Sequence, residues 1–216
     1  MVEINERGKR KYYISSDKKH IYITDKEGKS LYFTNDFVDI SYFSKNSVSC
    51  ALSNLFPYEF TFKGCQAKSV EGVLQSLKHG NPEVQRIIYN YAGKDAYHTR
   101  AASFENDWRN EHYLHCGNKL IDRFDIEYQN LLNEIYIAVS SNPLFASTLR
   151  YTGDRVLLHS KGVSEPDETI LTPREYIDRL TIIRSSLLNL KDPSNDLNAL
   201  SETIAQDYYQ RGYIKK

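Results

Sequence analysis

The sequence predicts an α+β fold in which a β-meander precedes a mainly helical domain. In roughly the first forty residues, short runs of aromatic or β-branched residues alternate with turn-rich segments, a pattern typical of antiparallel strands. From Ser69 onward, apolar residues recur at helical spacing behind residues that cap helices. A chain of 216 residues is long enough to bury one core around these elements.

The strands are expected where the short apolar runs lie. The runs that predict the meander are residues 12–14, 21–23, 31–33 and 40–43, with turn-rich segments such as 16–19 and 25–28 between them. Residues 59–62 predict one more strand, which Lys63 and Gly64 close.

The helices are predicted from their caps and their apolar faces. Ser69 is a suitable N-cap, and Glu71 follows in the first turn, where the positive end of a helix favours a negative charge. The helices are expected over residues 69–78, 81–93, 122–139, 142–153, 172–190 and 194–211. Residues 94–120 contain the single tryptophan, Trp108, and give no clear pattern.

These elements predict three parts. A β-rich N-terminal extension over residues 1–39 is expected to pack on a main domain over residues 40–190, and residues 191–216 are expected to form an accessory helix.

The composition indicates an ordinary globular protein. Lys and Arg total 28, as do Asp and Glu, so the net charge does not favour nucleic acid or a membrane. Cys50, Cys65 and Cys116 are odd in number and not closely paired, which argues against a disulfide framework and a zinc site. No apolar run is long enough to span a bilayer, and no signal peptide follows Met1. We therefore expect a cytoplasmic protein with no metal, no cofactor and no membrane partner.

The most informative residues lie on the first predicted helix. Glu71, Gln75 and Lys78 project within about 60° of one another, beside the apolar face of that helix. An acid, an amide and an amine at this border could surround a small polar ligand. Alternatively, they form an ordinary surface set, since Glu–Lys pairs on helices contribute only about 0.2–0.5 kcal/mol.

The loop before this helix contains Ser53 and Asn54, which either satisfy local backbone groups or offer a hydroxyl and an amide to a ribose or phosphate. Aromatic residues that could stack on a base are Tyr42, Phe43, Phe56 and Trp108.

Basic residues lie among the tyrosines of the N-terminal meander: Arg7, Lys9, Arg10, Lys11, Lys18, Lys19, Lys26 and Lys29. Lys and Arg interleaved with aromatic residues suit single-stranded nucleic acid. The alternative is a solvated strand face whose edge lysines discourage aggregation.

Several segments resemble the NADAR, or YbiA-like, family, and the later ones are residues 131–158 and 183–187. Residues 42–44 resemble the end of its Phe-Tyr-Ser strand, residues 52–57 its (Phe/Leu)-Ser-Asn-Phe-x-Pro loop, and residues 69–78 its Ser-x-Glu-His-Tyr-x-Gln-Ala-x-Lys helix. The similarity extends over roughly residues 40–190, as a NADAR-like N-glycosidase domain. The chain departs from the family at Gly72, where members have His, and at residues 164–168, which replace a Trp-Gly-x-Gly loop.

The resemblance implies hydrolysis of a ribose C–N bond, with removal of ADP-ribose from ADP-ribosylated guanine in nucleic acid (the reversal of DarT-type modification) as the expected activity. The alternatives are an N-glycosidase acting on ribosylaminopyrimidine intermediates of riboflavin synthesis, and an inactive protein that binds ADP-ribose or a nucleotide.

The same resemblance implies roles for the candidate residues. Glu71 would stabilise the positive charge that develops at the anomeric carbon, or activate water. Lys78 would pair with phosphate or, as a neutral amine, form a Schiff base with the opened ribose. The substrate would be held by Ser53, Asn54 and Gln75, with Phe43, Phe56 or Trp108 stacking on its base.

Overall fold

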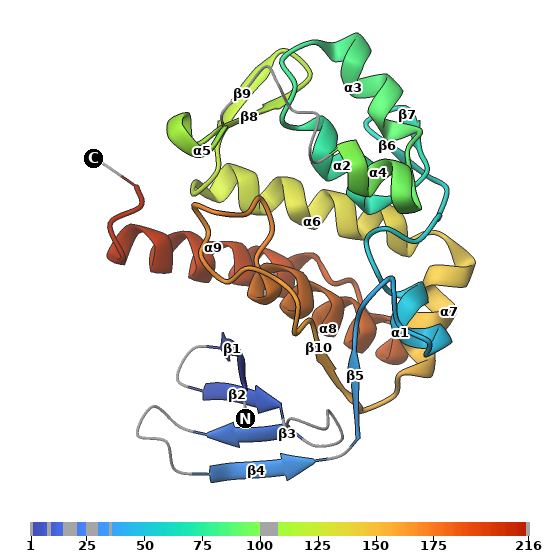
Figure 1. Cartoon of the computed structure of the whole chain (residues 1–216), viewed down its shortest axis with the longest axis vertical. Coiled ribbons are helices and arrows are strands. Elements are labelled where there is room, and N and C mark those ends of the chain that lie inside the picture. The colour runs from blue at the N-terminus through green and yellow to red at the C-terminus, as the bar shows by residue number, and fades with distance from the viewer. Residues whose placement is uncertain are drawn as a thin grey trace.

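The computed structural model describes residues 2–7, 10–14, 21–24, 30–34, 36–99 and 108–214. A small sheet, a layer of long helices, and a group of shorter helices and hairpins follow one another along the long axis of the molecule (Figure 1). The predicted α+β class is confirmed.

The N-terminal sheet is an antiparallel meander, as predicted. Its strands are β1 (Val2–Arg7), β2 (Arg10–Ile14), β3 (Ile21–Thr24) and β4 (Ser30–Thr34), which pair in sequence order. The strand β1 was not expected from the sequence. The side chains of the basic residues that were considered for nucleic-acid binding lie outside the described part of the chain.

The prediction of a strand at residues 40–43 is wrong. The strand here is β5 (Phe37–Asp39), which pairs in parallel with β10 (Val156–Leu158). The chain then turns, because the backbone N–H of Ser44 donates to the carbonyl of Ser41 at 3.0 Å. Ile21 of β3 is buried against Leu158 of this pair, so apolar packing attaches the meander to the rest of the protein.

The remaining elements are helices and two hairpins. The helices are α1 (Ser47–Ala51), α2 (Val70–Ser76), α3 (Pro82–Tyr89), α4 (Gly93–Thr99), α5 (Trp108–Glu111), α6 (Ile126–Ser140), α7 (Pro143–Tyr151), α8 (Pro173–Asn189) and α9 (Ser194–Gln210). The hairpins are β6 (Phe60–Phe62) with β7 (Cys65–Ala67), and β8 (Tyr113–Cys116) with β9 (Lys119–Asp122). None of the described helices has the length and apolar character needed to cross a bilayer.

The predicted helix starts are confirmed at four caps: the side chains of Ser69, Asn81, Asn142 and Thr172 accept backbone hydrogen bonds at the starts of α2, α3, α7 and α8. One expected end is wrong. Gly93 begins α4 instead of ending α3, which stops at Tyr89.

The helix α9 packs on α6 through buried contacts. Asn133 of α6 donates its amide to the carbonyl of Leu197 at 3.0 Å and to the hydroxyl of Ser201 at 2.9 Å. Leu197 belongs to the same apolar core as residues of α2, α6 and α8. The helix expected as an accessory therefore contributes to the main core.

A buried ion pair joins β9, α6 and α8. Arg123 donates from both terminal nitrogens to the two carboxylate oxygens of Glu175, each at 2.8 Å, and both side chains are fully buried. Glu175 also closes the capping box of α8 with Thr172 and accepts from Gln129 at 2.6 Å. The carboxylate is thus fully hydrogen-bonded, which a buried charge requires.

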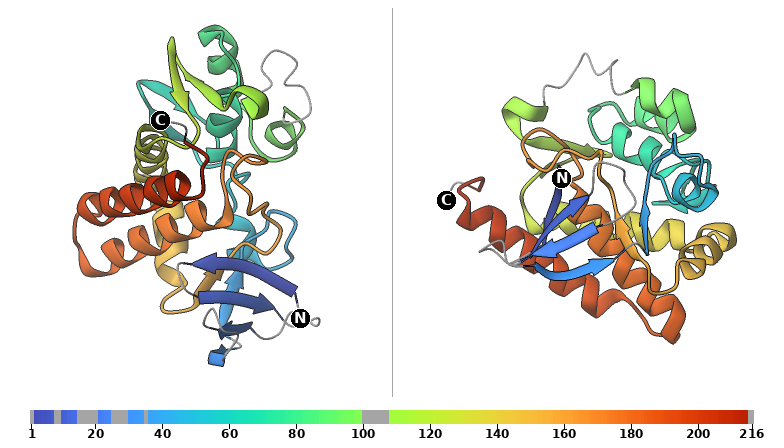
Figure 2. Two further views of the ribbon diagram at one scale, coloured as in Figure 1. Left: turned by 90° about the vertical axis from the view of Figure 1, so that its left-hand side faces the viewer. Right: turned by 60° about the horizontal axis from the view of Figure 1, so that its bottom comes forward.

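The same arginine holds the loop between β10 and α8. Its Nε donates to the carbonyl of Thr169 at 3.0 Å, and the hydroxyl of Tyr128 donates to the carbonyl of Ile170. This loop, drawn in orange, runs from α8 toward the group of shorter helices (Figure 2). The ion pair therefore fixes a segment that faces α2.

The pair makes stability depend on pH. Burial alone raises the pKa of Glu175, but the charge and hydrogen bonds of Arg123 outweigh burial and lower the pKa from 4.5 to about 2. A carboxyl whose pKa is depressed on folding contributes stability above its unfolded pKa, and this contribution is lost as the pH falls through the folded pKa. We expect the free energy of unfolding to drop between pH 4.5 and about 2.

The variant Arg123→Gln tests this origin, with Arg174→Gln as the matched control. Removing one partner of a buried pair costs about 3–5 kcal/mol. Arg174 pairs with Asp207 at the same 2.8 Å but is partly exposed, so its loss should cost at most about 1 kcal/mol. Urea unfolding at pH 7 and pH 3 should show less acid destabilisation in Arg123→Gln than in wild type. Equal costs for the two variants would refute this role of the pair.

Candidate functional site

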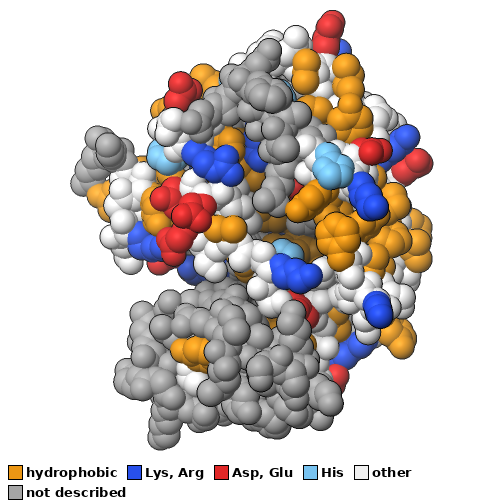
Figure 3. Space-filling view, in the orientation of Figure 1, with side chains coloured by type: hydrophobic (Ala, Val, Ile, Leu, Met, Phe, Trp, Pro, Cys, Tyr) orange, Lys and Arg blue, Asp and Glu red, His pale blue; other side chains and the backbone are white. Residues whose placement is uncertain are grey.

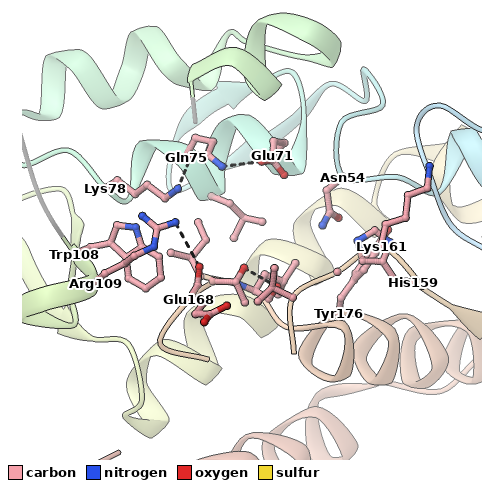
Figure 4. Close-up of a pocket in the computed structure, with 16 residues that line it drawn as sticks. Asn54, Glu71, Gln75, Lys78, Trp108, Arg109, His159, Lys161, Glu168 and Tyr176 are labelled. Carbon is pink, nitrogen blue, oxygen red and sulfur yellow. Dashed lines mark hydrogen bonds between the residues drawn. The ribbon is translucent and has the colours of Figure 1, made fainter. Parts of the chain in front are cut away.

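The loop of residues 52–57 is tied to the first turn of α2. The backbone N–H of Glu71 donates to the carbonyl of Asn54 at 2.8 Å. The Asn54 side-chain oxygen accepts from the buried hydroxyl of Tyr136 at 3.0 Å, which leaves its amide nitrogen directed into the space in front of α2 (Figure 4). Loop and helix therefore form one rigid wall.

Close packing explains the glycine at position 72. A Cβ there would lie 2.7 Å from the carbonyl oxygen of Tyr91 and 2.9 Å from that of Ile88. Ser69 fixes this contact, because its hydroxyl donates to the Tyr91 carbonyl at 2.7 Å while it accepts from the Gly72 N–H at 2.9 Å. The position leaves no room for the histidine of the family that the sequence resembles.

The three polar residues of α2 form a hydrogen-bonded row. The Gln75 amide nitrogen donates to Oε1 of Glu71 at 2.7 Å, and Nζ of Lys78 donates to the Gln75 amide oxygen at 2.8 Å. Because an ammonium group only donates and a carboxylate only accepts, the orientation of the amide is determined. Oε2 of Glu71 receives no hydrogen bond from the described residues.

The row lies at the edge of the core. Gln75 and Lys78 are 3% and 4% exposed, whereas Glu71 is half-buried. The expected helical end at residue 78 is wrong, since α2 stops at Ser76. Lys78 stays in line because its backbone N–H donates to the Gln75 carbonyl at 3.2 Å.

The row forms one wall of a pocket of about 220 Å³. The pocket lining consists of Asn54, Glu71, Leu74, Gln75, Lys78, Trp108, Arg109, His159, Lys161, Gly162, Val163, Glu168, Thr169, Ile170, Leu171 and Tyr176. The opposite wall is the loop that Arg123 holds. The surface is hollowed near the centre of this face, with basic side chains on both sides of the hollow (Figure 3).

One end of the pocket contains Trp108 with two cations. The guanidinium carbon of Arg109 lies 4.9 Å from the centroid of the Trp108 ring, and Nζ of Lys78 lies 5.8 Å from it. Arg109 also donates to the carbonyl of Glu168 at 3.4 Å. Trp108 is only 1% exposed, so in this arrangement its ring offers no open face on which a base could stack.

The other end contains His159, Tyr176 and Asn54 (Figure 4). Nδ1 of His159 lies 2.8 Å from the carbonyl oxygen of Ile40. Because a carbonyl oxygen only accepts, Nδ1 carries the proton, and Nε2 is then free to accept one. Burial, followed by the charge of Glu71, raises the pKa of Tyr176, whose protonated hydroxyl donates to the carbonyl of Leu52.

Three of the expected substrate-binding residues lie outside the pocket lining. The hydroxyl of Ser53 accepts from the backbone of Leu55 at 3.3 Å, as a turn residue does. Phe43 is 57% exposed and makes edge contacts with neighbouring rings, and Phe56 packs against Tyr58 with centroids 4.8 Å apart. The structure brings together Glu71, Gln75, Lys78, Asn54 and Trp108.

No sequence pattern pointed to Arg109, His159 or Tyr176 as site residues. Arg109 lies in the segment without a clear pattern, and the other two flank a loop whose path the sequence does not reveal. Within the described part of the chain, no three His, Cys, Asp or Glu side chains gather as metal ligands.

Replacement of Gly72 tests the packing of α2. In Gly72→Ala, the new methyl group meets two backbone carbonyls that cannot rotate away, so we expect a loss of about 1–3 kcal/mol, typical of overpacking. The control is Asn130→Ala at an exposed position within α6, where alanine should be neutral or slightly stabilising. Thermal unfolding measures both, and an unchanged midpoint in Gly72→Ala would show that α3 is free to move away.

Comparison with known proteins identifies a phage family. The family model described as bacteriophage protein GP30.3 matches residues 46–185. A protein of Enterobacteria phage T4, described as an uncharacterized 17.1 kDa protein in the Gp30–rIII intergenic region, is 34% identical over 143 residues. This match covers 64% of the present chain and 91% of the T4 protein. No solved structure matches the chain.

The assignment to the NADAR family is therefore wrong. Two of the segments on which it rested, residues 52–57 and 69–78, lie inside the part that the phage family model matches. They resemble that other family partly through residues with local roles, such as the N-cap Ser69 and the turn residue Ser53. The chain belongs to the bacteriophage protein GP30.3 family.

Proposed function

We propose that this protein is an N-glycosidase that hydrolyses the C–N bond between a ribose and a base. The observation that supports the proposal is the placement of Glu71. Gln75 holds one oxygen of its carboxylate, and the other oxygen receives no hydrogen bond from the described residues at the wall of the pocket. A carboxylate in this setting suits chemistry in which positive charge develops on a sugar.

The reaction would proceed through an oxocarbenium-like transition state. As the C–N bond breaks, positive charge develops at the anomeric carbon and the ring oxygen. The Glu71 carboxylate would stabilise this charge, or take a proton from the attacking water. The base leaves with the electron pair of the broken bond and needs a proton, which the imidazolium form of His159, at the other end of the pocket, would supply.

Lys78 supports the carboxylate through the amide between them. Its hydrogen bond to Gln75 holds the amide in the orientation that donates to Glu71. Direct participation is the alternative role: the neutral amine would attack the opened ribose and form a Schiff base. The two roles are distinguishable, because only the second gives an adduct that borohydride reduces.

The substrate that we propose is ADP-ribosylated guanine in nucleic acid. The cations at the Trp108 end suit phosphate, and the amide of Asn54 suits a ribose hydroxyl. A ribosylaminopyrimidine phosphate carries the same kind of C–N bond and is the second substrate to test. A protein that binds ADP-ribose without cleaving it is the remaining alternative.

The variant Glu71→Gln tests the proposal, because it keeps the size of the side chain and removes its charge. We expect release of ADP-ribose from an ADP-ribosylated oligonucleotide to fall by a factor of about 10²–10⁴, the range for a lost general acid or base. The matched control is Glu83→Gln on the exposed side of α3, which should retain wild-type activity. Mass spectrometry of the released product measures both.

Each result decides between the alternatives. Release of ADP-ribose that depends on Glu71 supports the proposal. If only the ribosylaminopyrimidine phosphate is turned over, the protein is an N-glycosidase and this metabolite is its substrate. Saturable binding of ADP-ribose without turnover of either substrate identifies a binder. If the protein neither binds ADP-ribose nor turns over either substrate, the proposal is overturned.

A further inference from the structure

The indole nitrogen of Trp108 is a buried donor with no acceptor. Trp108 is fully buried at the pocket wall, and its Nε1–H has no hydrogen-bond partner in the part of the chain that the structure describes. Tryptophan only donates, so no rearrangement of its own proton removes the deficit. Because a buried N–H without a partner is unfavourable, an acceptor that entered the pocket here would be stabilised.

Two positive charges lie beside the same ring. Arg109 and Lys78 both lie within 6 Å of the Trp108 centroid, and both side chains line the pocket (Figure 4). Arg109 makes a long hydrogen bond to a carbonyl, and no described carboxylate pairs with its guanidinium. Two like charges held at one end of a pocket repel each other, so an anion between them is favoured over water.

Among the described residues of the lining, the positive charges at this end lie closer to Trp108 than the carboxylates do. Glu71 lies at the far end of the row, where Gln75 separates it from Lys78. Glu168 opposes an anion, but its side chain is exposed, and exposed charges are screened by water and salt. Its carbonyl, not its carboxylate, contacts Arg109.

We propose that the Trp108 end of the pocket is a phosphate subsite that takes the diphosphate of a nucleotide. Arg109, Lys78 and the Trp108 indole provide the donors, and Arg suits phosphate because of its planar fork of N–H groups. The nucleotide as the source of the phosphate rests on the proposed function. The side-chain amide of Gln75 lies between the Glu71 carboxylate and the Lys78 ammonium group, which leaves room for a sugar between the phosphate and the carboxylate.

Fluorescence can report on this subsite directly, because Trp108 is the single tryptophan of the chain. The full-length protein is titrated at low salt with pyrophosphate, ADP and adenosine, and calorimetry measures the affinities in parallel. We expect pyrophosphate and ADP to bind and to change the emission of Trp108. Adenosine has no phosphate, so its affinity should be the same for wild type and for Arg109→Gln.

Two variants identify the donors. Arg109→Gln should weaken binding of pyrophosphate and ADP at least tenfold, whereas Arg86→Gln, an exposed arginine on α3, should leave it unchanged. Trp108→Phe keeps an aromatic ring beside the cations and removes the N–H donor. Calorimetry should show binding several-fold weaker than in wild type.

The subsite is overturned if pyrophosphate does not bind, or if Arg109→Gln binds as tightly as Arg86→Gln. Failure of the proposed function gives a different result. If pyrophosphate binding depends on Arg109 but no hydrolysis occurs, the subsite stands and the glycosidase activity is refuted. If hydrolysis depends on Glu71 and Arg109→Gln has the same KM as wild type, the glycosidase activity stands and the subsite is refuted.

Discussion

The structure depends on one buried ion pair between Arg123 and Glu175. Neither side chain is accessible to water, so their charges persist only because they pair with each other and are hydrogen-bonded. Arg179 extends the network, because it donates to the carbonyl of Glu175 at 2.8 Å and to the side chain of Asn133 at 2.9 Å. Through Asn133 the network reaches α9, so β9, α6, α8 and α9 are fixed relative to one another.

This network also shapes the pocket. The capping box puts Glu175 at the start of α8, Arg123 binds Glu175, and the same arginine holds the loop at Thr169. That loop is the wall opposite α2. The α2 wall is fixed independently, because Gly72 lets the helix pack against the backbone at the end of α3. The two walls keep the pocket open between a carboxylate and a pair of cations.

Local features of the fold could be predicted from the sequence. The caps Ser69, Asn142 and Thr172 were recognisable because capping depends on residues a few positions apart. Helical periodicity places Glu71 and Gln75 on one side of α2, and Lys78, which follows the end of the helix, stays in line through its backbone hydrogen bond to Gln75. The pairing of β5 with β10 could not be predicted, since it joins segments more than a hundred residues apart, and neither could the approach of Arg109, His159 and Tyr176 to α2. The family assignment failed because short polar motifs also arise from local capping and turn requirements.

A crystal structure of the protein soaked with ADP-ribose tests the central claim most directly. We expect the diphosphate to lie against Arg109 and Trp108, with the anomeric carbon about 3–3.5 Å from a carboxylate oxygen of Glu71, the separation of a reactive arrangement. Density for the ligand elsewhere on the surface, or in the pocket with its ribose turned away from Glu71, would contradict it.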